Sequence, residues 1–474
     1  MDNQSSHDSM MVGMASEQTR TTTPPPLRAS AEGAPGRTAA RAGDRRTRLL
    51  VVGIVLAALN LRPAITSLGA LLEEVRDGLG MSGSVAGLLT SVPPLCFAVF
   101  GVMAPRLARR FGPGAVVCAG MAAITAGLLL RPYAGGTAGF LAASALALMG
   151  IAVSNVLMPV IVKRHFPDRV GSMTGLYSMA LALGTSAAAA VTVPMTEALG
   201  GSWRTGLALW AGLAAAALLP WLPLARNRGT ATGERGTAAG GGRPAGERSE
   251  GARPTGEPPK TGPRPAPGAH ARVPQPSAAP LRITRSRTAW ALAVFFGLQA
   301  TAAYITMGWM PQIFRDAGVP ASTAGLLLAV TMAMGVPLAF VIPRVATRLP
   351  HQGPIVLALG GCGLVGYAGL YLAPAGGAWA WALLLGIANC AFPLALTMVG
   401  MRARTGTGVT QLSAFAQSTG YLISIPGPLL VGVLYQHSGG WGLPLALMAG
   451  LMIPQTVVGF LAGRDRTVEE EAAR

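Results

Sequence analysis

The sequence predicts an all-α membrane protein with twelve transmembrane helices arranged as two parallel six-helix repeats. Three observations support this fold class: the composition, the length of the apolar blocks and a likeness between the two halves of the chain. Of the 474 residues, 51% are hydrophobic and 12% are charged. An ordinary soluble domain carries about 25% charged residues. The mean hydropathy is +0.46, which is high for a soluble protein.

The apolar residues gather in blocks of roughly 20, the length that a helix needs to cross a hydrocarbon core of about 30 Å. The blocks do not alternate every second residue, as the strands of a membrane barrel would. We therefore expect spans near 49–71, 83–104, 114–132, 137–162, 172–195, 203–225, 289–311, 321–342, 354–373, 378–401, 408–434 and 441–462.

The segments outside the spans are polar and rich in Gly, Pro, Ala, Thr and Arg, a composition that cannot form a packed core. This predicts a disordered tail at 1–47, a disordered basic linker at 226–288 and a tail at 464–474. The two six-helix halves are then 48–225 and 289–463.

The basic residues of the short loops lie mostly on one side of the predicted membrane. That side holds Arg106, Arg109, Arg110, Lys163, Arg164, Arg169, Arg344, Arg348, Arg402 and Arg404. Because loops rich in Lys and Arg stay in the cytoplasm, we expect a multi-pass protein of the cytoplasmic membrane with both termini inside. The net charge of +18 sits in these loops and in the tails, so we reject nucleic-acid binding.

The two halves resemble each other at several matched positions. The first spans continue into ALLEEVRD at 70–77 and WMPQIFRD at 309–316, and the next spans begin with AGLL at 86–89 and at 324–327. Each half has an even number of spans, so the repeats run parallel. Such repeats are related by a pseudo-two-fold axis along the membrane normal, with a binding site near the midplane between the halves.

Segment 101–110 reads GVMAPRLARR and resembles the loop motif between the second and third spans of the major facilitator superfamily. Two positions depart from that motif, because Pro105 replaces its aspartate and Ala108 replaces its second glycine. Segments 60–67 (NLRPAITS) and 86–90 (AGLLT) are more specific and resemble the cyanate/nitroimidazole transporter branch of the superfamily. The resemblance covers both halves and implies a secondary transporter that works by alternating access.

Arg62 is the one Lys or Arg placed well inside a predicted span, whereas all 19 acidic residues fall in tails, linker, loops or span ends. A charge at that depth costs at least about 2.5 kcal/mol unless a partner, water or a ligand compensates it. One interpretation is an anion-binding group in a central cavity. The other is an arginine satisfied by backbone carbonyls at a helix break, since Pro63 removes a backbone donor there.

Polar side chains recur at matched depths in the two halves. We consider as substrate-binding candidates Asn60 and Gln299 in the first spans, Asn155 and Asn389 in the fourth spans, and Tyr177, Gln417 and Tyr421 in the fifth spans. Paired amides near the axis could contact a small polar solute. They could equally hold neighbouring helices together, and both interpretations stay open.

The loop residues Arg106, Arg109, Arg110, Arg344 and Asp168 could form a latch that gates the cytoplasmic side. The alternative is that these arginines only fix the topology.

We expect a transporter of a small anionic or polar solute rather than an enzyme, because no GxSxG, HExxH or paired intramembrane carboxylates occur. The four cysteines lie in apolar blocks without a metal-site spacing, so no metal or other cofactor is predicted. The expected partners are the solute, the lipid bilayer and a coupling ion such as a proton, and the protein is expected to be a monomer. Proton-coupled multidrug efflux is the alternative function, and a membrane enzyme or receptor is a distant third.

Overall fold

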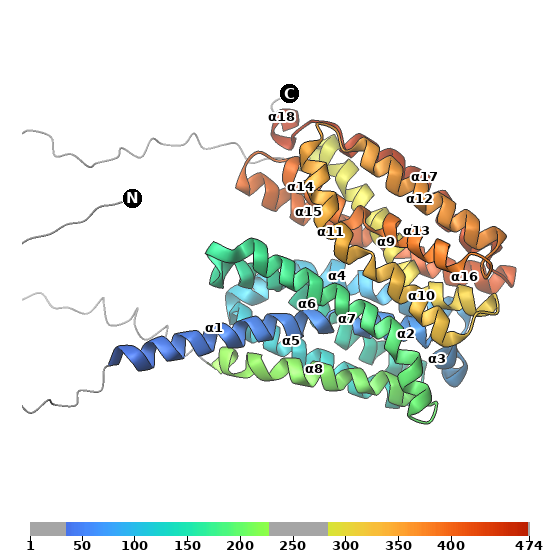
Figure 1. The fold of residues 1–474 in the computed structure, drawn as a ribbon, viewed down its shortest axis with the longest axis horizontal. Helices are drawn as coiled ribbons and strands as arrows, with labels where there is room; N and C mark the ends of the chain where they lie inside the picture. The colour runs from blue at the N-terminus through green and yellow to red at the C-terminus, as the bar shows by residue number, and fades with distance from the viewer. Residues whose placement is uncertain (1–34, 227–282, 473–474) are drawn as a thin grey trace, which may run out of the picture. The chain divides into compact units, whose positions relative to one another are not determined.

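The computed structural model describes residues 35–226 and 283–472, and all of the regular elements within them are helices joined by short loops (Figure 1). The described residues from 48 onward form one compact unit, and the unit before it, residues 1–47, is described only from residue 35, where it is helical. Twelve helical segments in the described residues are long and apolar enough to cross a membrane, which confirms the predicted fold class.

The first half runs from the first membrane span to the end of α8. Its elements are α1 (Pro35–Asn60), α2 (Pro63–Ala70), α3 (Leu72–Leu79), α4 (Gly83–Phe111), α5 (Pro113–Leu130), η1 (Arg131–Tyr133), α6 (Thr137–His165), η2 (Pro167–Arg169), α7 (Val170–Ala198) and α8 (Trp203–Arg226).

The second half has the same order of spans, with three of them divided into two helices. Its elements are η3 (Ile283–Arg285), α9 (Arg287–Asp316), α10 (Ala321–Ala333), α11 (Gly335–Arg348), α12 (Gly353–Leu372), α13 (Ala378–Asn389), α14 (Ala391–Met401), α15 (Gly406–Ser424), α16 (Pro426–Ser438), α17 (Gly442–Ala462) and α18 (Val468–Ala472). The divided spans are α10 with α11, α13 with α14, and α15 with α16 in this half, and α1 with α2 in the first.

The expected tails and linker are only partly described. Residues 1–34 and 227–282 lie outside the described residues. Two described stretches that we expected to be disordered contain helix: residues 35–47 begin α1, and residues 283–288 include η3 and the start of α9. In the expected C-terminal tail, Val468–Ala472 form α18. Helix α18 is short, and its carboxylates bind the starts of α9 and α15, as described below.

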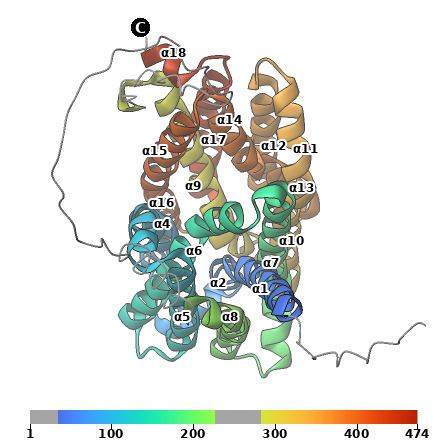
Figure 2. The same cartoon turned by 90° about the vertical axis from the view of Figure 1, so that its left-hand side faces the viewer.

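The halves meet through two repeat-related pairs of helices. Helix α4 packs against α16, and α10 packs against α7, so that the second and fifth spans of opposite halves pair twice (Figure 2). Glycines that match in the repeat lie at both contacts. A Cβ on Gly87 would be 2.8 Å from the Leu429 carbonyl oxygen, and a Cβ on Gly325 would be 2.6 Å from that of Ala189. Glycine therefore permits the close approach of backbones that these interfaces need.

Two hydrophobic clusters form the core. The larger one surrounds the middle and the end of the bundle that carries Arg106, which we call the Arg106 end. The smaller one lies toward the opposite end, which carries Glu73 and is called the Glu73 end. The smaller cluster joins Leu71 and Val75 of the first half to the fully buried Trp309 and to Phe314 of the second. The halves are thus packed together tightly at the Glu73 end.

Candidate functional site

The first span is interrupted beside Arg62, as the sequence predicts. Helix α1 ends at Asn60 and α2 begins at Pro63, while Arg62 takes φ −126° and ψ −28° between them. The Arg62 carbonyl accepts hydrogen bonds from the backbone N–H groups of Ile65 and Thr66, at 2.9 and 3.1 Å. Pro63 has no N–H to continue the ladder of α1, so the break leaves the Arg62 side chain free to turn from the regular helical face.

The Arg62 guanidinium faces aromatic side chains of both halves. Its carbon lies 5.9 Å from the centre of the Phe97 ring. It also interacts electrostatically with Tyr177 of α7, Tyr304 of α9 and Tyr421 of α15. Arg62 is half-buried, and none of the carboxylates in the described part of the chain pairs with it. We call Arg62, Phe97, Tyr177, Tyr304 and Tyr421 the Arg62 cluster.

The rings of the cluster join the two halves. Phe97 of α4 stacks on Tyr421 with ring centres 5.1 Å apart, and it approaches Tyr304 at 6.5 Å. Phe296 of α9 meets Tyr421 edge to face at 5.2 Å. Because Phe97 belongs to the first half and both tyrosines to the second, any movement between the halves changes the surroundings of Arg62.

Asn155 lies beside this cluster through Tyr177. The Tyr177 hydroxyl donates to the Asn155 Oδ1 atom at 2.8 Å, so the phenol fixes the orientation of the amide. The amide nitrogen of Asn155 makes no hydrogen bond among the described residues. Together with Asn155, the cluster therefore presents a guanidinium, an amide N–H₂ and the hydroxyls of Tyr304 and Tyr421, all of which can donate, and this set suits a ligand with several acceptor atoms.

The other predicted amides point elsewhere. Asn60 is buried and donates to the Leu56 and Leu213 carbonyls at 2.8 and 3.1 Å, which ties α1 to α8. Gln299 donates to the Asn389 side chain at 3.2 Å and accepts from Gln455 of α17 at 2.9 Å. In each half, then, the first-span amide joins the first span to the sixth. This is the role in helix packing that the sequence left open.

Gln417 makes its hydrogen bond within its own helix, donating to the Ser413 hydroxyl at 2.7 Å. Among the described residues, Gln417 makes no hydrogen bond with a member of the Arg62 cluster. Of the eight predicted binding residues, the structure brings Arg62, Asn155, Tyr177 and Tyr421 together and leaves Asn60, Gln299, Asn389 and Gln417 outside.

The proposed latch residues are all exposed at the Arg106 end. Arg344 donates to the Phe340 carbonyl at 3.2 Å on its own helix. Arg106, Arg109, Arg110 and Asp168 form no ion pair between the halves among the described residues. A latch made of these residues is not formed in this conformation.

Ion pairs between the halves are found instead at the Glu73 end. Arg315 of α9 binds Glu73 and Glu74 of α3, each at 2.9 Å, and Gln312 donates to Glu73 at 3.3 Å. These residues belong to the repeat-related segments 70–77 and 309–316. The segments therefore meet each other across the boundary between the halves.

A second layer of polar contacts reinforces this end. The Trp309 indole N–H donates to the Thr90 hydroxyl at 3.1 Å, and the Ser84 hydroxyl donates to Gln436 at 2.7 Å. Within the second half, Asp316 accepts from Tyr435 and Trp441, both at 2.8 Å. The Glu73 end is thus closed by a network of charged and polar side chains, for which the sequence analysis predicted no role in closure.

Two buried arginines that sequence reasoning did not single out hold backbone carbonyls. Arg131 lies 2.9 Å from the Ala64 carbonyl oxygen, just after the helix break, and so supports α2 beneath Arg62. Arg402 donates to the carbonyls of Ala462 and Gly463 at 3.1 and 2.8 Å. Burial lowers the pKa of Arg402, and nearby Asp465 opposes that shift. Neither arginine belongs to the Arg62 cluster.

Comparison with known proteins places the chain among transporters. The model of the Major Facilitator Superfamily matches residues 50–423. An uncharacterized transporter of Bacillus subtilis, YycB, is 32% identical over 88% of this chain and 94% of its own length. The 2-nitroimidazole transporter of Escherichia coli is 31% identical over 89% and 96%, and its cyanate transport protein CynX is 28% identical over 85% and 95%.

Among solved structures, the inward-open xylose transporter XylE of Escherichia coli superposes with a TM-score of 0.64 at 10% identity. The match covers 90% of this chain and 98% of that one. These relatives confirm the resemblance to the cyanate/nitroimidazole branch that segments 60–67 and 86–90 carry.

Proposed function

The chain belongs to the major facilitator superfamily, and from this premise we propose that it is a secondary transporter that moves a small anionic or polar solute by alternating access. The solute binds at the Arg62 cluster, between the halves. Its chemistry is cyanate-like or nitroaromatic-like, by analogy with the 2-nitroimidazole and cyanate transporters of Escherichia coli. The Arg106 end faces the cytoplasm, in keeping with its excess of arginine.

The observation that carries this proposal is the position of Arg62. It is half-buried within a membrane span, it is surrounded by rings of both halves, and none of the described carboxylates neutralises it. An unpaired cation at membrane depth is costly, so a ligand with negative charge or strong acceptor atoms compensates it. A cationic drug would meet repulsion from Arg62 and an excess of hydrogen-bond donors.

The arrangement of contacts between the halves supports alternating access. Among the described residues, the ion pairs between the halves all lie at the Glu73 end, whereas Arg106, Arg109, Arg110 and Arg344 form none at the Arg106 end. We infer that this conformation is closed at the Glu73 end, and that in the opposite conformation the contacts of Arg315 break. Energy comes from an ion gradient, with the proton as the first coupling ion to test.

Uptake by proteoliposomes tests the role of Arg62. Cyanate and 2-nitroimidazole are offered under pH gradients of either sign. We expect Arg62→Gln to lower uptake at least ten-fold, because a hydrogen bond to a charged group contributes about 1.5–3 kcal/mol. Arg62→Lys keeps the charge but loses the planar guanidinium group, which can donate two parallel hydrogen bonds, so partial activity is expected.

The matched control is Arg348→Gln, which removes the same charge from an exposed position at the Arg106 end. It should insert and transport normally. Equal uptake by wild type and Arg62→Gln, at equal amounts of inserted protein, would show that Arg62 does not bind the solute.

A further inference from the structure

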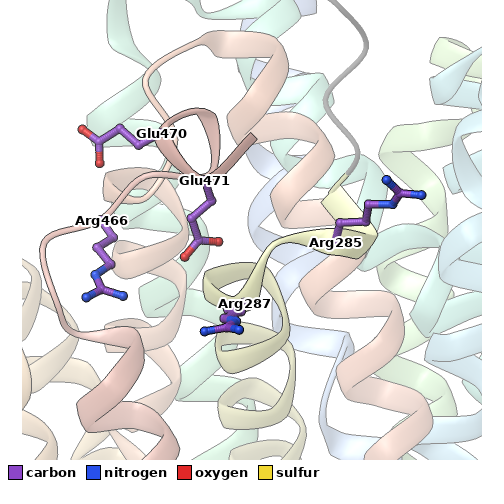
Figure 3. Close-up of a pocket in the computed structure, with 5 residues that line it drawn as sticks. All are labelled: Arg285, Arg287, Arg466, Glu470 and Glu471. Carbon is purple, nitrogen blue, oxygen red and sulfur yellow. The ribbon is translucent and has the colours of Figure 1, made fainter. Parts of the chain in front are cut away.

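A pocket of about 240 Å³ lies at the Arg106 end, away from the Arg62 cluster. It is lined by Arg285 of η3, Arg287 at the start of α9, and Arg466, Glu470 and Glu471 of the C-terminal segment (Figure 3). Three guanidinium groups from two distant parts of the chain therefore meet around one space. None of these residues takes part in the proposed transport site.

The two carboxylates of the pocket are already engaged. Glu471 accepts from the hydroxyls of Ser286 and Thr288 at 2.6 and 2.7 Å and from the Thr288 backbone N–H at 3.2 Å, so it caps the start of α9. Glu470 forms an ion pair with Arg404 outside the pocket. In Figure 3 the Glu470 side chain points away from Arg287. Hydrogen bonds thus hold Glu471 at the start of α9, and among the described residues neither carboxylate forms an ion pair with Arg285, Arg287 or Arg466.

The three arginines are exposed and have no side-chain hydrogen bond or ion pair with any other described residue. In Figure 3, Glu471 points toward Arg287, Arg466 extends down beside them on the same side of the start of α9, and Arg285 points to the other side. Arg287 and Arg466 therefore border the same space with their donors free. Guanidinium groups bind the oxygens of phosphate in pairs, which makes a phosphate ester the best match for this space.

The depth of the pocket distinguishes a lipid from a soluble phosphate. The first span of the second half begins at Arg287, so the pocket lies where that helix leaves the membrane. Trp290, one turn further along, is 45% exposed and donates its indole N–H to the Thr284 carbonyl at 2.9 Å. Exposed tryptophans with a satisfied N–H are typical of the interface between hydrocarbon and headgroups. The pocket is consequently at the level of lipid phosphates.

We propose that this pocket binds the phosphate of an anionic phospholipid headgroup through Arg287 and Arg466, with Arg285 at its rim. One lipid would then bridge the C-terminal segment and the start of α9. Basic pockets on the cytoplasmic side of membrane proteins offer the same chemistry to anionic headgroups. Since α9 also carries Tyr304, the bound lipid stabilises a helix of the Arg62 cluster.

Lipid binding to purified, delipidated full-length protein tests the proposal without any transport assay. Dioctanoyl phosphatidylglycerol, dioctanoyl phosphatidylcholine and inorganic phosphate are titrated separately, and bound lipid is counted by native mass spectrometry. We expect saturable binding of phosphatidylglycerol. The Arg287→Gln/Arg466→Gln double variant should bind it at least ten-fold more weakly, and Arg287→Lys/Arg466→Lys should be intermediate.

The matched control is Arg344→Gln/Arg348→Gln, which removes two exposed charges at the same end outside the pocket. It should bind phosphatidylglycerol like wild type. Equal loss in the control and pocket variants would overturn the site, because it would reflect net charge alone. Binding of inorganic phosphate as tight as that of phosphatidylglycerol, or no preference for phosphatidylglycerol over phosphatidylcholine, would overturn the assignment to an anionic lipid.

Discussion

At the scale of single residues, the Arg62 cluster combines one fixed cation with hydroxyls of both halves. The orientation of Asn155 depends on the Tyr177 hydroxyl, which donates to its Oδ1 atom at 2.8 Å. The amide nitrogen, a donor, is left without a hydrogen bond among the described residues. Tyr177 therefore acts by holding Asn155 as well as through its own interaction with Arg62.

Tyr177→Phe should weaken solute binding about five-fold, since a neutral hydrogen bond contributes about 1 kcal/mol and the Asn155 amide loses its fixed orientation. Kinetics of uptake in proteoliposomes should show a raised KM. Tyr133→Phe is the matched control, because that tyrosine is 68% exposed and outside the cluster. If both variants have the wild-type KM, Asn155 is not oriented by Tyr177 for binding.

The residues of the cluster could be predicted in part. Arg62, Asn155, Tyr177 and Tyr421 stand out because polar groups are rare in the spans. Phe97 and Tyr304 were missed, since aromatic residues in an apolar span usually pack in the core. Asn60 and Gln299 were predicted to bind the solute but bond to neighbouring helices instead. A helix that is apolar all round does not indicate which neighbouring helix a single amide side chain will contact.

At the scale of helices, paired glycines set the distance between the halves. A Cβ on Gly87 or Gly325 would lie under 3 Å from a carbonyl oxygen of the other half. Such a contact cannot relax by moving a flexible side chain, because the neighbour is backbone. The glycines that the repeat relates therefore serve the same packing at two interfaces, which explains why the pattern AGLL occurs in both halves.

Replacing Gly325 by alanine should force α10 away from α7 and lower the melting temperature of the purified protein by several degrees. Differential scanning fluorimetry in detergent measures this. Gly400→Ala is the control, since a Cβ there meets nothing within 4 Å and helix propensity favours alanine. A melting temperature unchanged by Gly325→Ala would mean that the close contact of α10 with α7 does not contribute to the stability of the protein.

The C-terminal helix should detach in acid. Burial raises the pKa of Glu471, but hydrogen bonds from Ser286 and Thr288 outweigh it, so the net pKa lies below the ordinary value. A carboxylate whose pKa is lower in the docked helix than in the undocked one stabilises docking fully when the pH is above the undocked pKa. This stabilisation is lost as the pH falls through the docked pKa. The pKa of Glu469 is lowered in the same net sense, since hydrogen bonds from Arg404 and Thr405 outweigh its burial.

Hydrogen exchange of the C-terminal segment, corrected for intrinsic rates, checks this prediction. Protection of 467–472 should be complete at neutral pH and fall in acid below the ordinary carboxyl pKa. Glu469→Gln/Glu471→Gln should lower the protection at neutral pH and remove most of its pH dependence. Protection that stays constant down to pH 3 would contradict the role of these carboxylates. The docking itself could not be predicted, because three glutamates near a chain end normally indicate a solvated tail.

At the scale of the whole molecule, twelve spans and their repeat could be predicted from block length and matched motifs alone. The spans agree with the prediction within a few residues at most ends, and the break beside Pro63 is present. The closure of the Glu73 end could not be read in the same way, because Glu73, Glu74 and Arg315 look like ordinary loop charges. Their place in the matched segments 70–77 and 309–316 was the available signal, since repeats around an axis bring matched segments together.

The closed Glu73 end must open during the proposed transport cycle. Arg315 binds both Glu73 and Glu74 at 2.9 Å, and Trp309 and Ser84 add hydrogen bonds nearby. For the solute to leave or enter at the Glu73 end, these contacts must break while both halves stay folded. Removing them should therefore favour opening at that end.

Arg315→Gln should make the Glu73 end more accessible. A cysteine placed at Thr90, in a chain whose four native cysteines are replaced, reports this through labelling by a membrane-impermeant maleimide. We expect labelling to rise several-fold in the Arg315→Gln background. Arg315→Lys should lie between, because it keeps the charge. Labelling that is equal in all three backgrounds would mean that the ion pairs do not hold this end closed.

A reversible cross-link across the closed end tests the central claim, that the halves must separate at Glu74 and Arg315 in every cycle. In the same cysteine-free background, Glu74→Cys and Arg315→Cys are combined and oxidised, and uptake of an identified solute is measured before and after reduction. A cross-link between Arg404→Cys and Glu470→Cys, an ion pair within one half, is the control. We predict that oxidation stops uptake in the first pair alone and that reduction restores it. Full uptake with the halves cross-linked at residues 74 and 315 would contradict the account.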